Sequence, residues 1–546
     1  MDSSKGQSVV ADILEKFGKY QILQYFFACL PIIFVSMNNV NYVFIAGDIG
    51  YRCYIPECET SKLEYSVPWW PDTVPNKCLK PVLKDTFVQG DICTNSSFTG
   101  EFVECTRWVY ESNDTVIGEL DMACEPWRTN FIGMVRNVGM AISMLINGWL
   151  CDRIGRKPAL IICSLGVLMG NFKTVAKSYN LYISLEFIES LMSGGAYTSA
   201  TVLMIEIGGK KTRFLAGVLF AYAIYMGEAI FACIAMFVPY WKHLLYIMCC
   251  PSLIFLSYIY LIKESPRWQI LNRRTDKAKD TLRKIAAMNK LKVNLQYLDN
   301  ISEDSLKQTC DKPHAKREGY IDVFKSKEMI KRVLVASFCR FTVSFIYYGL
   351  IVNSVYLPGN KYTNFLLAAV MSFPGELISM YFMNKVGRKL PLCLGYLICA
   401  GANIATGYTP EDYNSVKITL FLIGKLVVAA CYTGIATYTM ELFPTSVRGS
   451  LLGFCTLASC AGTTLAPLSS ILTSISPVLT SLCFGCTAVI SSLLLIFTPE
   501  TKDLPLMDTI SQVHDFIITA KKKKAEKKLK CAADNNASDI ENSTHL

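Results

Sequence analysis

Long apolar stretches alternate with short polar stretches along most of the chain. Windows of about 20 apolar residues, enough to cross the hydrocarbon core as a helix, recur through both halves of the sequence. Twelve such windows lie at residues 22–45, 127–150, 158–176, 181–207, 214–238, 243–262, 333–355, 362–383, 390–407, 417–441, 450–471 and 477–498. The pattern therefore predicts an all-α membrane protein with twelve transmembrane helices.

A short basic turn joins the second and third windows, and a similar turn joins the eighth and ninth. The first turn contains Asp152, Arg153, Gly155, Arg156 and Lys157, and the second runs from Asn384 through Arg388 to Lys389. A glycine at position 155 permits the backbone angles of a tight reversal. Because basic residues favour the cytosolic side of a membrane, we expect both turns to be cytosolic hairpins.

Basic residues in the short connections fix an expected orientation. They fall on alternate connections, at Arg153, Arg156, Lys157, Lys210, Lys211, Arg213, Lys385, Arg388, Lys389 and Arg448. These connections and both termini are then cytosolic. We expect a multi-pass plasma-membrane protein in which residues 1–21 form a cytosolic N-terminus and the first helix acts as the targeting signal.

The polar segment at residues 46–126 is expected outside the cell. It contains six cysteines, at Cys53, Cys58, Cys78, Cys93, Cys105 and Cys124. Six cysteines in an oxidising compartment predict three disulfides, and all fifteen pairings remain open. Asn95-Ser-Ser and Asn113-Asp-Thr are acceptor motifs for glycosylation.

The sequence signals of the first half return in the second half. Asp152 corresponds to Asn384, Glu206 to Glu441, and Glu264 to Glu500, each at an offset of about 235 residues. We therefore expect two six-helix halves, at 22–262 and 333–502, joined by a cytosolic linker at 263–332 with amphipathic helices. A duplicated carrier of this kind places its substrate between the halves near mid-membrane. Residues 503–546 are expected to form a basic, disordered tail.

Composition supports a membrane protein and excludes several other classes. The chain is 52% hydrophobic and 18% charged, and its net charge of +10 follows mostly from topology. A nucleic-acid partner is therefore not expected, whereas the lysine run at 521–524 suits anionic lipid. No phosphate-binding loop with an invariant lysine appears, and no histidines or other metal ligands cluster. We expect no metal, no cofactor and no enzymatic activity.

Several motifs resemble those of the major facilitator superfamily and, within it, the organic cation/anion/zwitterion transporter family. They are the hairpin at 148–157, the start of the cysteine-rich loop at 46–58, Glu264-Ser-Pro-Arg-Trp268, Glu441-Leu-Phe-Pro444 with Arg448, and Pro499-Glu-Thr-Lys502. The resemblance covers residues 10–505. It implies two pseudo-symmetric six-helix bundles that carry small organic ions across the plasma membrane. Transport would be driven by the electrochemical gradient of the substrate, by exchange, or by a coupled ion.

The chain departs from that family at positions that bear on substrate charge. Where cation carriers tend to have an acid in helix 11 and anion carriers an arginine, our alignment gives Cys460. In helix 8 the family often has an acid two residues before the proline, and here Ser372 takes that place. Glu376 lies one helical turn beyond, on the same face, and is expected to take over that role. Helix 4 reads Glu186 and Ser190 in place of an arginine and a glycine.

Ionisable side chains within apolar windows are functional candidates because they are costly to bury in a membrane. They are Arg136, Glu186, Glu189, Glu228, Arg340, Glu376 and Lys425. The excess of acids favours cationic substrates. Glu228, deep in helix 5, is the favoured substrate residue. Glu186 is expected to be solvated near the outer membrane surface, and mutual neutralisation of Arg340 and Glu376 remains an alternative to substrate binding.

Aromatic rings supply the other half of an organic-cation site, because their faces attract ammonium groups. The candidates are Tyr197, Tyr225, Tyr347 and Tyr348, with packing as the alternative role. The resemblance aligns Tyr197 and Tyr347 with aromatic positions of the family's binding cavity.

Charged residues at the inner helix ends are candidates for a gate. Asp152, Arg153 and Arg156 with Glu206, Arg213, Glu441 and Arg448 offer opposite charges from both halves. Such pairs would hold the inner side shut and break on opening, the alternative being that they only fix topology.

We expect a polyspecific transporter of organic cations or zwitterions such as carnitine-like compounds. The alternatives are an organic anion transporter, a sugar-type facilitator, and a cell-surface receptor that uses the cysteine-rich loop.

Overall fold

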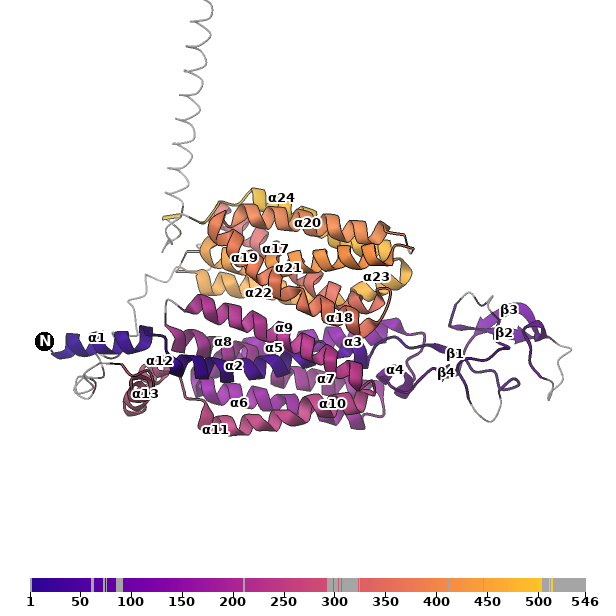
Figure 1. Ribbon diagram of the computed structural model, residues 1–546, viewed down its shortest axis with the longest axis horizontal. Coiled ribbons are helices and arrows are strands. Elements are labelled where there is room, and N and C mark those ends of the chain that lie inside the picture. Colours follow the sequence, from indigo (N-terminus) through magenta and orange to yellow (C-terminus); the bar gives the residue numbers. More distant parts are fainter. Residues whose placement is uncertain are drawn as a thin grey trace, which may run out of the picture.

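The computed structural model describes most of the chain. The described residues are 2–59, 63–71, 74, 76–84, 92–209, 212–291, 298, 303, 306, 323, 325–410, 412–444, 446–502, 510 and 512–513, without the side chains of 2–7, 11, 213 and 214. Lys210, Lys211 and the lysine run at 521–524 lie outside this set. Figure 1 shows two helical bundles stacked on each other, with a small β-containing segment projecting from one end.

The N-terminal bundle begins with α1 (Asp2–Glu15). Its membrane-length helices are α2 (Lys19–Asn39) with α3 (Tyr42–Ile45), α5 (Pro126–Ile154), α6 (Arg156–Gly166) with η2 (Val167–Val175), α7 (Tyr179–Ser193) with α8 (Gly195–Gly208), α9 (Arg213–Phe237), and α10 (Trp241–Cys249) with η3 (Cys250–Ser257) and α11 (Tyr258–Leu261). The short helices α12 (Pro266–Leu271) and α13 (Thr275–Met288) follow.

The C-terminal bundle repeats this arrangement. Its elements are α17 (Lys327–Asn353) with η4 (Ser354–Tyr356), α18 (Lys361–Val370) with α19 (Ser372–Lys385), α20 (Lys389–Tyr408), α21 (Asn414–Leu442), α22 (Arg448–Leu465) with η5 (Ala466–Leu468) and α23 (Ser469–Ile475), and α24 (Pro477–Ile496). Eleven helices of the described chain are long and apolar enough to span a membrane. The α7–α8 pair covers the remaining predicted window, where Glu186 and Glu189 interrupt the apolar run.

Close packing explains the glycines where α7 meets α8. A Cβ added to Gly195 would lie 2.7 Å from the Cβ of Asn147 in α5 and 2.7 Å from the sulfur of Cys163 in α6. Only glycine permits so close an approach of three helices.

The N-terminal segment, expected in the cytosol, contains a helix that packs on the rest of the chain. It forms the helix α1, in which Val10, Ile13 and Leu14 are buried. These residues form an apolar stripe at helical spacing, and α1 packs against α13. Thus the second half of α1 contributes to the fold through these buried residues.

The cysteine-rich loop is a small disulfide-linked unit. Strands β1 (Tyr51–Cys53) and β4 (Trp108–Tyr110) pair antiparallel, as do β2 (Leu79–Leu83) and β3 (Phe98–Glu104), with η1 (Asn95–Ser97) and α4 (Val116–Glu119) between and after them. All six cysteines are paired, as Cys53–Cys105, Cys58–Cys93 and Cys78–Cys124. The structure thus selects one of the fifteen open pairings.

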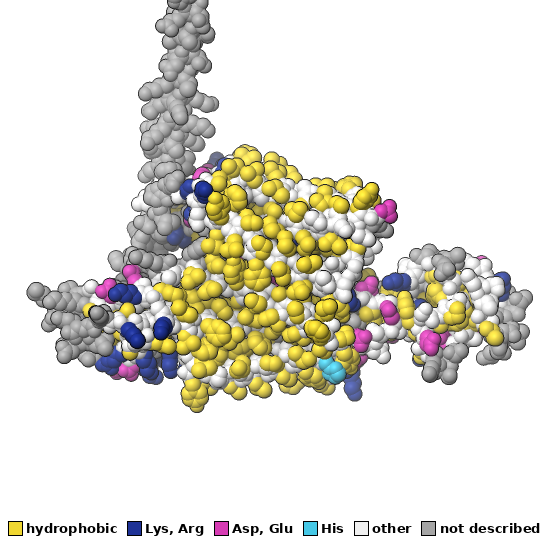
Figure 2. All heavy atoms as spheres, in the orientation of Figure 1, with side chains coloured by type: hydrophobic (Ala, Val, Ile, Leu, Met, Phe, Trp, Pro, Cys, Tyr) yellow, Lys and Arg dark blue, Asp and Glu magenta, His cyan; other side chains and the backbone are white. Residues whose placement is uncertain are grey.

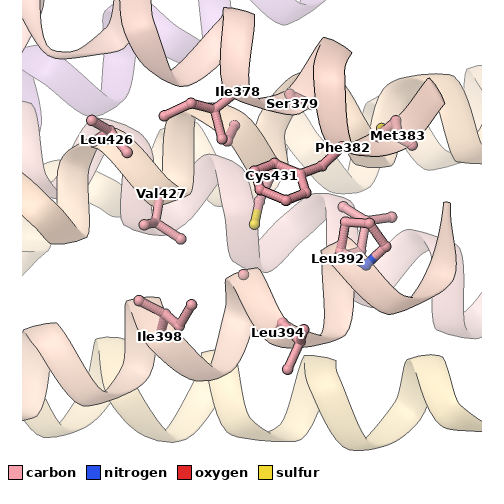
Figure 3. A pocket seen from close by; sticks show the side chains of 13 residues that line it. Ile378, Ser379, Phe382, Met383, Leu392, Leu394, Ile398, Leu426, Val427 and Cys431 are labelled. Atoms are coloured by element: carbon pink, nitrogen blue, oxygen red, sulfur yellow. The ribbon is translucent and has the colours of Figure 1, made fainter. Parts of the chain in front are cut away.

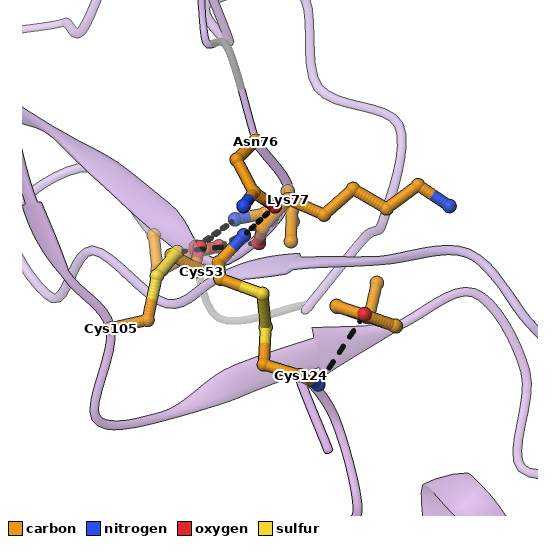
Figure 4. Close-up of a disulfide and its surroundings, with 9 residues drawn as sticks. Cys53, Asn76, Lys77, Cys105 and Cys124 are labelled. Carbon is orange, nitrogen blue, oxygen red and sulfur yellow. Dashed lines mark hydrogen bonds and ion pairs between the residues drawn. A yellow bond between two sulfur atoms is a disulfide. The ribbon is translucent and has the colours of Figure 1, made fainter. Parts of the chain in front are cut away.

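Two of these bridges lie next to each other. The backbone N–H of Cys105 donates to the carbonyl of Cys78 (3.2 Å), which brings Cys53–Cys105 beside Cys78–Cys124 (Figure 4). Cys124 lies two residues before α5, so the second bridge ties the loop directly to a membrane-length helix. Asn95 and Asn113 are exposed, and their glycosylation stays a prediction.

The two ends of the bundle differ in charge. We call the end that carries the cysteine-rich unit the loop end, and the end with the α5–α6 and α19–α20 turns the hairpin end. Figure 2 shows apolar side chains covering the bundle between them, and basic side chains gathered at the hairpin end. This distribution is typical of a multi-pass membrane protein.

Candidate functional site

Two glutamate–tyrosine pairs join the halves at the centre of the bundle. Tyr225 and Glu228 lie one turn apart on α9 of the N-terminal half. The Tyr225 hydroxyl donates to Oε2 of Glu376 in α19 (3.5 Å), and the Tyr347 hydroxyl in α17 donates to Oε2 of Glu228 (3.1 Å). Each half therefore supplies one carboxylate and one phenol to the other.

Aromatic rings surround these pairs. The Tyr347 ring centroid lies 6.3 Å from that of Tyr225, 5.2 Å from that of Tyr348 and 5.5 Å from that of Tyr432. Phe373 packs edge-on against Tyr225 at 5.6 Å. Sequence reasoning missed Tyr432 and Phe373, although Tyr432 lies two turns from the candidate Lys425 on α21. The centre offers the ring faces that attract organic ammonium groups.

Tyr197 lies at the edge of this cluster. Its ring packs edge-on against Phe220 at 5.7 Å, and it lies within electrostatic range of Glu228. It is 6% exposed. Tyr197 therefore contributes to the wall of the N-terminal half and touches neither carboxylate through a hydrogen bond among the described residues.

The two central carboxylates have different surroundings. Glu376 is fully buried, and its Oε2 accepts from Thr433 and Tyr225. Its Oε1 has no hydrogen-bond partner, and no basic side chain of the described chain forms an ion pair with it. A buried carboxylate oxygen without a partner is energetically costly, so Glu376 is well suited to bind a cation from outside the chain.

Glu228 has a basic neighbour. Lys425 on α21 is the charged group that interacts with it electrostatically, and both side chains are at most 1% exposed. The Lys425 ammonium lies 3.1 Å from the Tyr347 ring centroid and donates to the Tyr347 carbonyl (3.3 Å). These contacts leave Glu376, and not Glu228 as the sequence favoured, as the central carboxylate without a basic neighbour among the described residues.

Arg340 and Glu376 do not neutralise each other. No ion pair joins them within the described part of the chain, so that alternative is wrong. Arg340 lies in α17 and interacts electrostatically with Cys460 and Tyr432, and its Nε has no hydrogen-bond partner. The position where the family places a charge in helix 11 is thus neutral here but lies beside a guanidinium.

A second set of buried charges lies within the N-terminal half. Arg136 of α5 and Lys173 of η2 pair with Glu186 and Glu189 of α7, and all four side chains are fully buried. Lys173 lies 2.9 Å from Glu186 and 3.1 Å from Glu189, and Arg136 lies 2.7 Å from Glu189. We call these four residues the ionic quartet. Its net formal charge is zero.

The quartet corrects one expectation and adds one residue that the sequence analysis did not name. Glu186 was predicted to be solvated, but the prediction is wrong because Lys173 and Arg136 reach it from neighbouring helices. Sequence reasoning also missed Lys173, which lies near the end of an apolar window. The sequence contained the signal for it, because burying a lysine in an apolar window is as costly as burying Glu186 or Glu189.

The hairpin-end motifs form the same contacts in both halves. Arg156 lies 2.9 Å from Glu206 and 2.9 Å from Asp152, and Arg388 lies 3.1 Å from Glu441. Asn384 leaves Arg388 without the counterpart of Asp152. The repeated motifs therefore form equivalent arginine–glutamate pairs in the two halves, and the second half lacks the negative charge that Asp152 provides in the first.

Two further glutamates hold the hairpin backbones. Glu264 accepts from the backbone N–H groups of Arg156 (3.0 Å) and Lys157 (3.2 Å), and Glu500 accepts from those of Arg388 (2.8 Å) and Lys389 (3.0 Å). Burial raises the pKa of the Glu264 carboxyl. Burial also acts on Glu500, but its backbone donors outweigh it, so the net shift of that pKa is downward. Glu500 is therefore the more firmly ionised of the two.

The glycine of each hairpin is required by this geometry. Gly155 has φ +112° and Gly387 has φ +142°. A Cβ on Gly155 would collide with the Glu264 carboxyl, and one on Gly387 would lie 2.9 Å from Oε2 of Glu500. The predicted tight reversal at Gly155 is confirmed.

The described contacts of two other gate candidates, Arg153 and Arg448, lie within their own half. Arg153 places its guanidinium over the Trp149 ring at 5.0 Å, and Arg448 donates to the Phe443 carbonyl at 2.9 Å. The Arg213 side chain lies outside the described set. Among described residues, no hydrogen bond or ion pair joins the two halves at the hairpin end. Their role as a gate between the halves stays a prediction.

The halves meet at the loop end. The Asn137 side chain donates to the Thr463 carbonyl (3.1 Å), and Ser470 bonds to Asn130. Phe44 stacks on Tyr362 with centroids 4.9 Å apart. Together with the central pairs, these contacts close the interface between the bundles at this end.

An apolar pocket of about 230 Å³ lies apart from the central residues, between α19, α20 and α21 (Figure 3). Ile378, Phe382 and Leu392 lie around it, with Val427 and Cys431 on the α21 side. No aspartate, glutamate, histidine, lysine or arginine lines it. A site of this composition suits hydrocarbon and does not suit an organic ion.

The fold matches solved transporters. The partially occluded inward-open structure of the xylose transporter XylE from E. coli superposes with a TM-score of 0.56 at 17% identity, covering 71% of this chain and 93% of that chain. The same symporter bound to a bromodeoxyglucose gives a TM-score of 0.52 at 19% identity, covering 69% and 88%. The likeness confirms the predicted major facilitator fold.

Sequence relatives span nearly the whole chain. The organic cation transporter protein of Drosophila melanogaster is 28% identical over 94% of this chain and 95% of its own length. Solute carrier family 22 member 6-A of Xenopus laevis is 27% identical over 94% and 95%, and organic anion transporter 3 of Pongo abelii is 26% identical over 96% and 97%. These relatives include both cation and anion transporters.

A family model for sugar and other transporters matches residues 95–511, most of the chain. This match makes the protein a transporter and not an enzyme, and the relatives confirm the resemblance that the motifs indicated. The chain belongs to the sugar (and other) transporter family of the major facilitator superfamily, within its group of organic ion transporters.

Proposed function

We propose that this protein carries organic cations, and zwitterions with an ammonium group, across the plasma membrane by alternating access. The observation that carries the proposal is the buried Glu376 carboxylate, whose Oε1 has no partner. Tyr225 holds its other oxygen from the opposite half, so the site spans the interface between the bundles. A cation bound there would contact both halves, as alternating access requires.

The distribution of charge supports an orientation. Basic residues gathered at the hairpin end favour a cytosolic location for that end and for both termini. The disulfide-linked loop unit suits the oxidising extracellular side. Because the halves meet at the loop end, the described state is then closed to the outside.

A panel of substrates tests the proposal. Cells that express the protein will take up radiolabelled tetraethylammonium and carnitine, and will not take up a hexose or a dicarboxylate. Running the panel with and without a sodium or proton gradient identifies any coupled ion. Hexose uptake alone would overturn the organic-ion function, and surface-expressed protein that moves none of these compounds would favour a receptor.

Organic anion transport is the second candidate, and Arg340 is the observation that favours it. Its guanidinium interacts electrostatically with Cys460, and its Nε lacks a partner. On this alternative a substrate carboxylate pairs with Arg340. Dicarboxylate uptake that is lost in Arg340→Gln, without any cation uptake, would establish it in place of our proposal.

Replacing Cys460 by Asp is expected to raise the preference for cations over anions about tenfold, because it places a carboxylate beside Arg340 and cancels its charge. The ratio of tetraethylammonium to dicarboxylate uptake measures the effect. Cys460→Asn provides a control of the same size without charge and is expected to leave the ratio near that of the wild type. An unchanged ratio in Cys460→Asp would remove position 460 from the substrate path.

A further inference from the structure

Lys425 places its ammonium over the face of a central aromatic ring. It lies at the interface of the two halves, with its ammonium 3.1 Å from the centroid of the Tyr347 ring. The same tyrosine donates its hydroxyl to Glu228. Lys425 and Glu228 thus contact the same Tyr347 side chain: the ammonium lies over its ring, and the carboxylate accepts from its hydroxyl.

The contacts of Lys425 are all internal. Its side chain is fully buried, its ammonium donates to the Tyr347 carbonyl, and Glu228 is the charged group that interacts with it. Among the described residues, Lys425 is likewise the charged group that interacts with Glu228. The two side chains form no direct ion pair among the described residues, so they compensate each other through Tyr347.

The centre therefore contains two acidic positions of unequal availability. At Glu228 the chain supplies its own ammonium and its own aromatic ring. At Glu376 the carboxylate retains an unpartnered oxygen, and the supporting groups are neutral hydroxyls. Only one negative charge remains for a substrate.

We propose that Lys425 is a built-in counter-ion for Glu228 that restricts this carrier to substrates with a single positive charge. The inference rests on the proposed transport of organic cations. With Lys425 in place, a second ammonium on a substrate meets a fixed positive charge at the other acidic position. Without Lys425, Glu228 becomes a second site for an ammonium group.

A charge-swap series tests this assignment in cells that express the full chain. Glu228→Gln leaves Lys425 uncompensated, so tetraethylammonium uptake is expected to fall about tenfold. The double variant Glu228→Gln with Lys425→Gln removes both charges and is expected to restore uptake to within about threefold of the wild type. Recovery by a second substitution cannot come from general damage to folding.

The dication hexamethonium provides the second measurement. Lys425→Gln alone is expected to raise the ratio of hexamethonium to tetraethylammonium uptake about tenfold, because it exposes Glu228. Ser372→Ala, which removes the other hydrogen-bond partner of the Tyr347 hydroxyl without changing charge, is the matched control for this ratio and should not raise it. Surface biotinylation normalises every variant to the protein at the membrane.

The outcomes separate this inference from the proposed function. A double variant no more active than Glu228→Gln overturns the counter-ion role, and so does an unchanged dication ratio in Lys425→Gln. New uptake of a dicarboxylate by Glu228→Gln that disappears in the double variant would make Lys425 an anion receptor instead. A wild-type protein that takes up no organic cation refutes the proposed function itself.

Discussion

Replacing Glu376 by Gln will abolish most uptake of organic cations while the protein still reaches the cell surface. The substitution keeps the size of the side chain and an acceptor for Thr433 and Tyr225, but removes the negative charge. Loss of one partner from a buried charge pair costs about 2 kcal/mol or more, which corresponds to about thirtyfold in binding. Uptake of tetraethylammonium, normalised to surface protein, measures the loss.

A matched variant separates the charge of Glu376 from its positioning. Thr433→Val removes one hydrogen-bond donor to the carboxylate and leaves the charge unchanged. It should weaken uptake by less than Glu376→Gln, because the carboxylate remains available to an ammonium. Wild-type uptake in Glu376→Gln would show that the cation binds elsewhere.

Replacing Lys173 by Met will destabilise the folded protein by about 3–5 kcal/mol, because it leaves Glu186 and Glu189 with only Arg136 as a counter-charge in a fully buried site. No water is available within the membrane to solvate the uncompensated acid. The melting temperature of the purified protein and its yield at the cell surface should both fall.

Two further variants identify charge balance as the cause. Lys173→Met with Glu186→Gln returns the ionic quartet to net neutrality and should recover much of the lost stability. Lys177→Met removes an exposed lysine four residues further along the chain, beyond the end of η2, and should have little effect. Equal melting temperatures for Lys173→Met and the wild type would contradict the structural importance of the quartet.

The quartet also connects local stability with the interface between the halves. It links α5, η2 and α7, and Arg136 is followed directly by Asn137, which bonds to the Thr463 carbonyl of the other half. A residue of the quartet and a residue of the interface between the bundles are thus neighbours on α5.

Much of the architecture could be predicted from local patterns. Apolar windows located the membrane-length helices to within a few residues, since hydrophobicity over about 20 residues is a property of the segment alone. The Gly155 turn was predictable for the same reason, and its positive φ agrees. Near-constant offsets between motifs predicted two like halves, and Arg156–Glu206 and Arg388–Glu441 form equivalent pairs.

The sequence by itself determined the number and order of the helices, the basic hairpins, the six paired cysteines and most of the ionisable side chains in the membrane. Only the tertiary structure decided which of those charges meet. Lys173 compensates Glu186, and Lys425 lies near Glu228, whereas Glu376 keeps a free oxygen. Such pairings depend on how helices distant in sequence are rotated against each other, and no local pattern along the chain records that rotation.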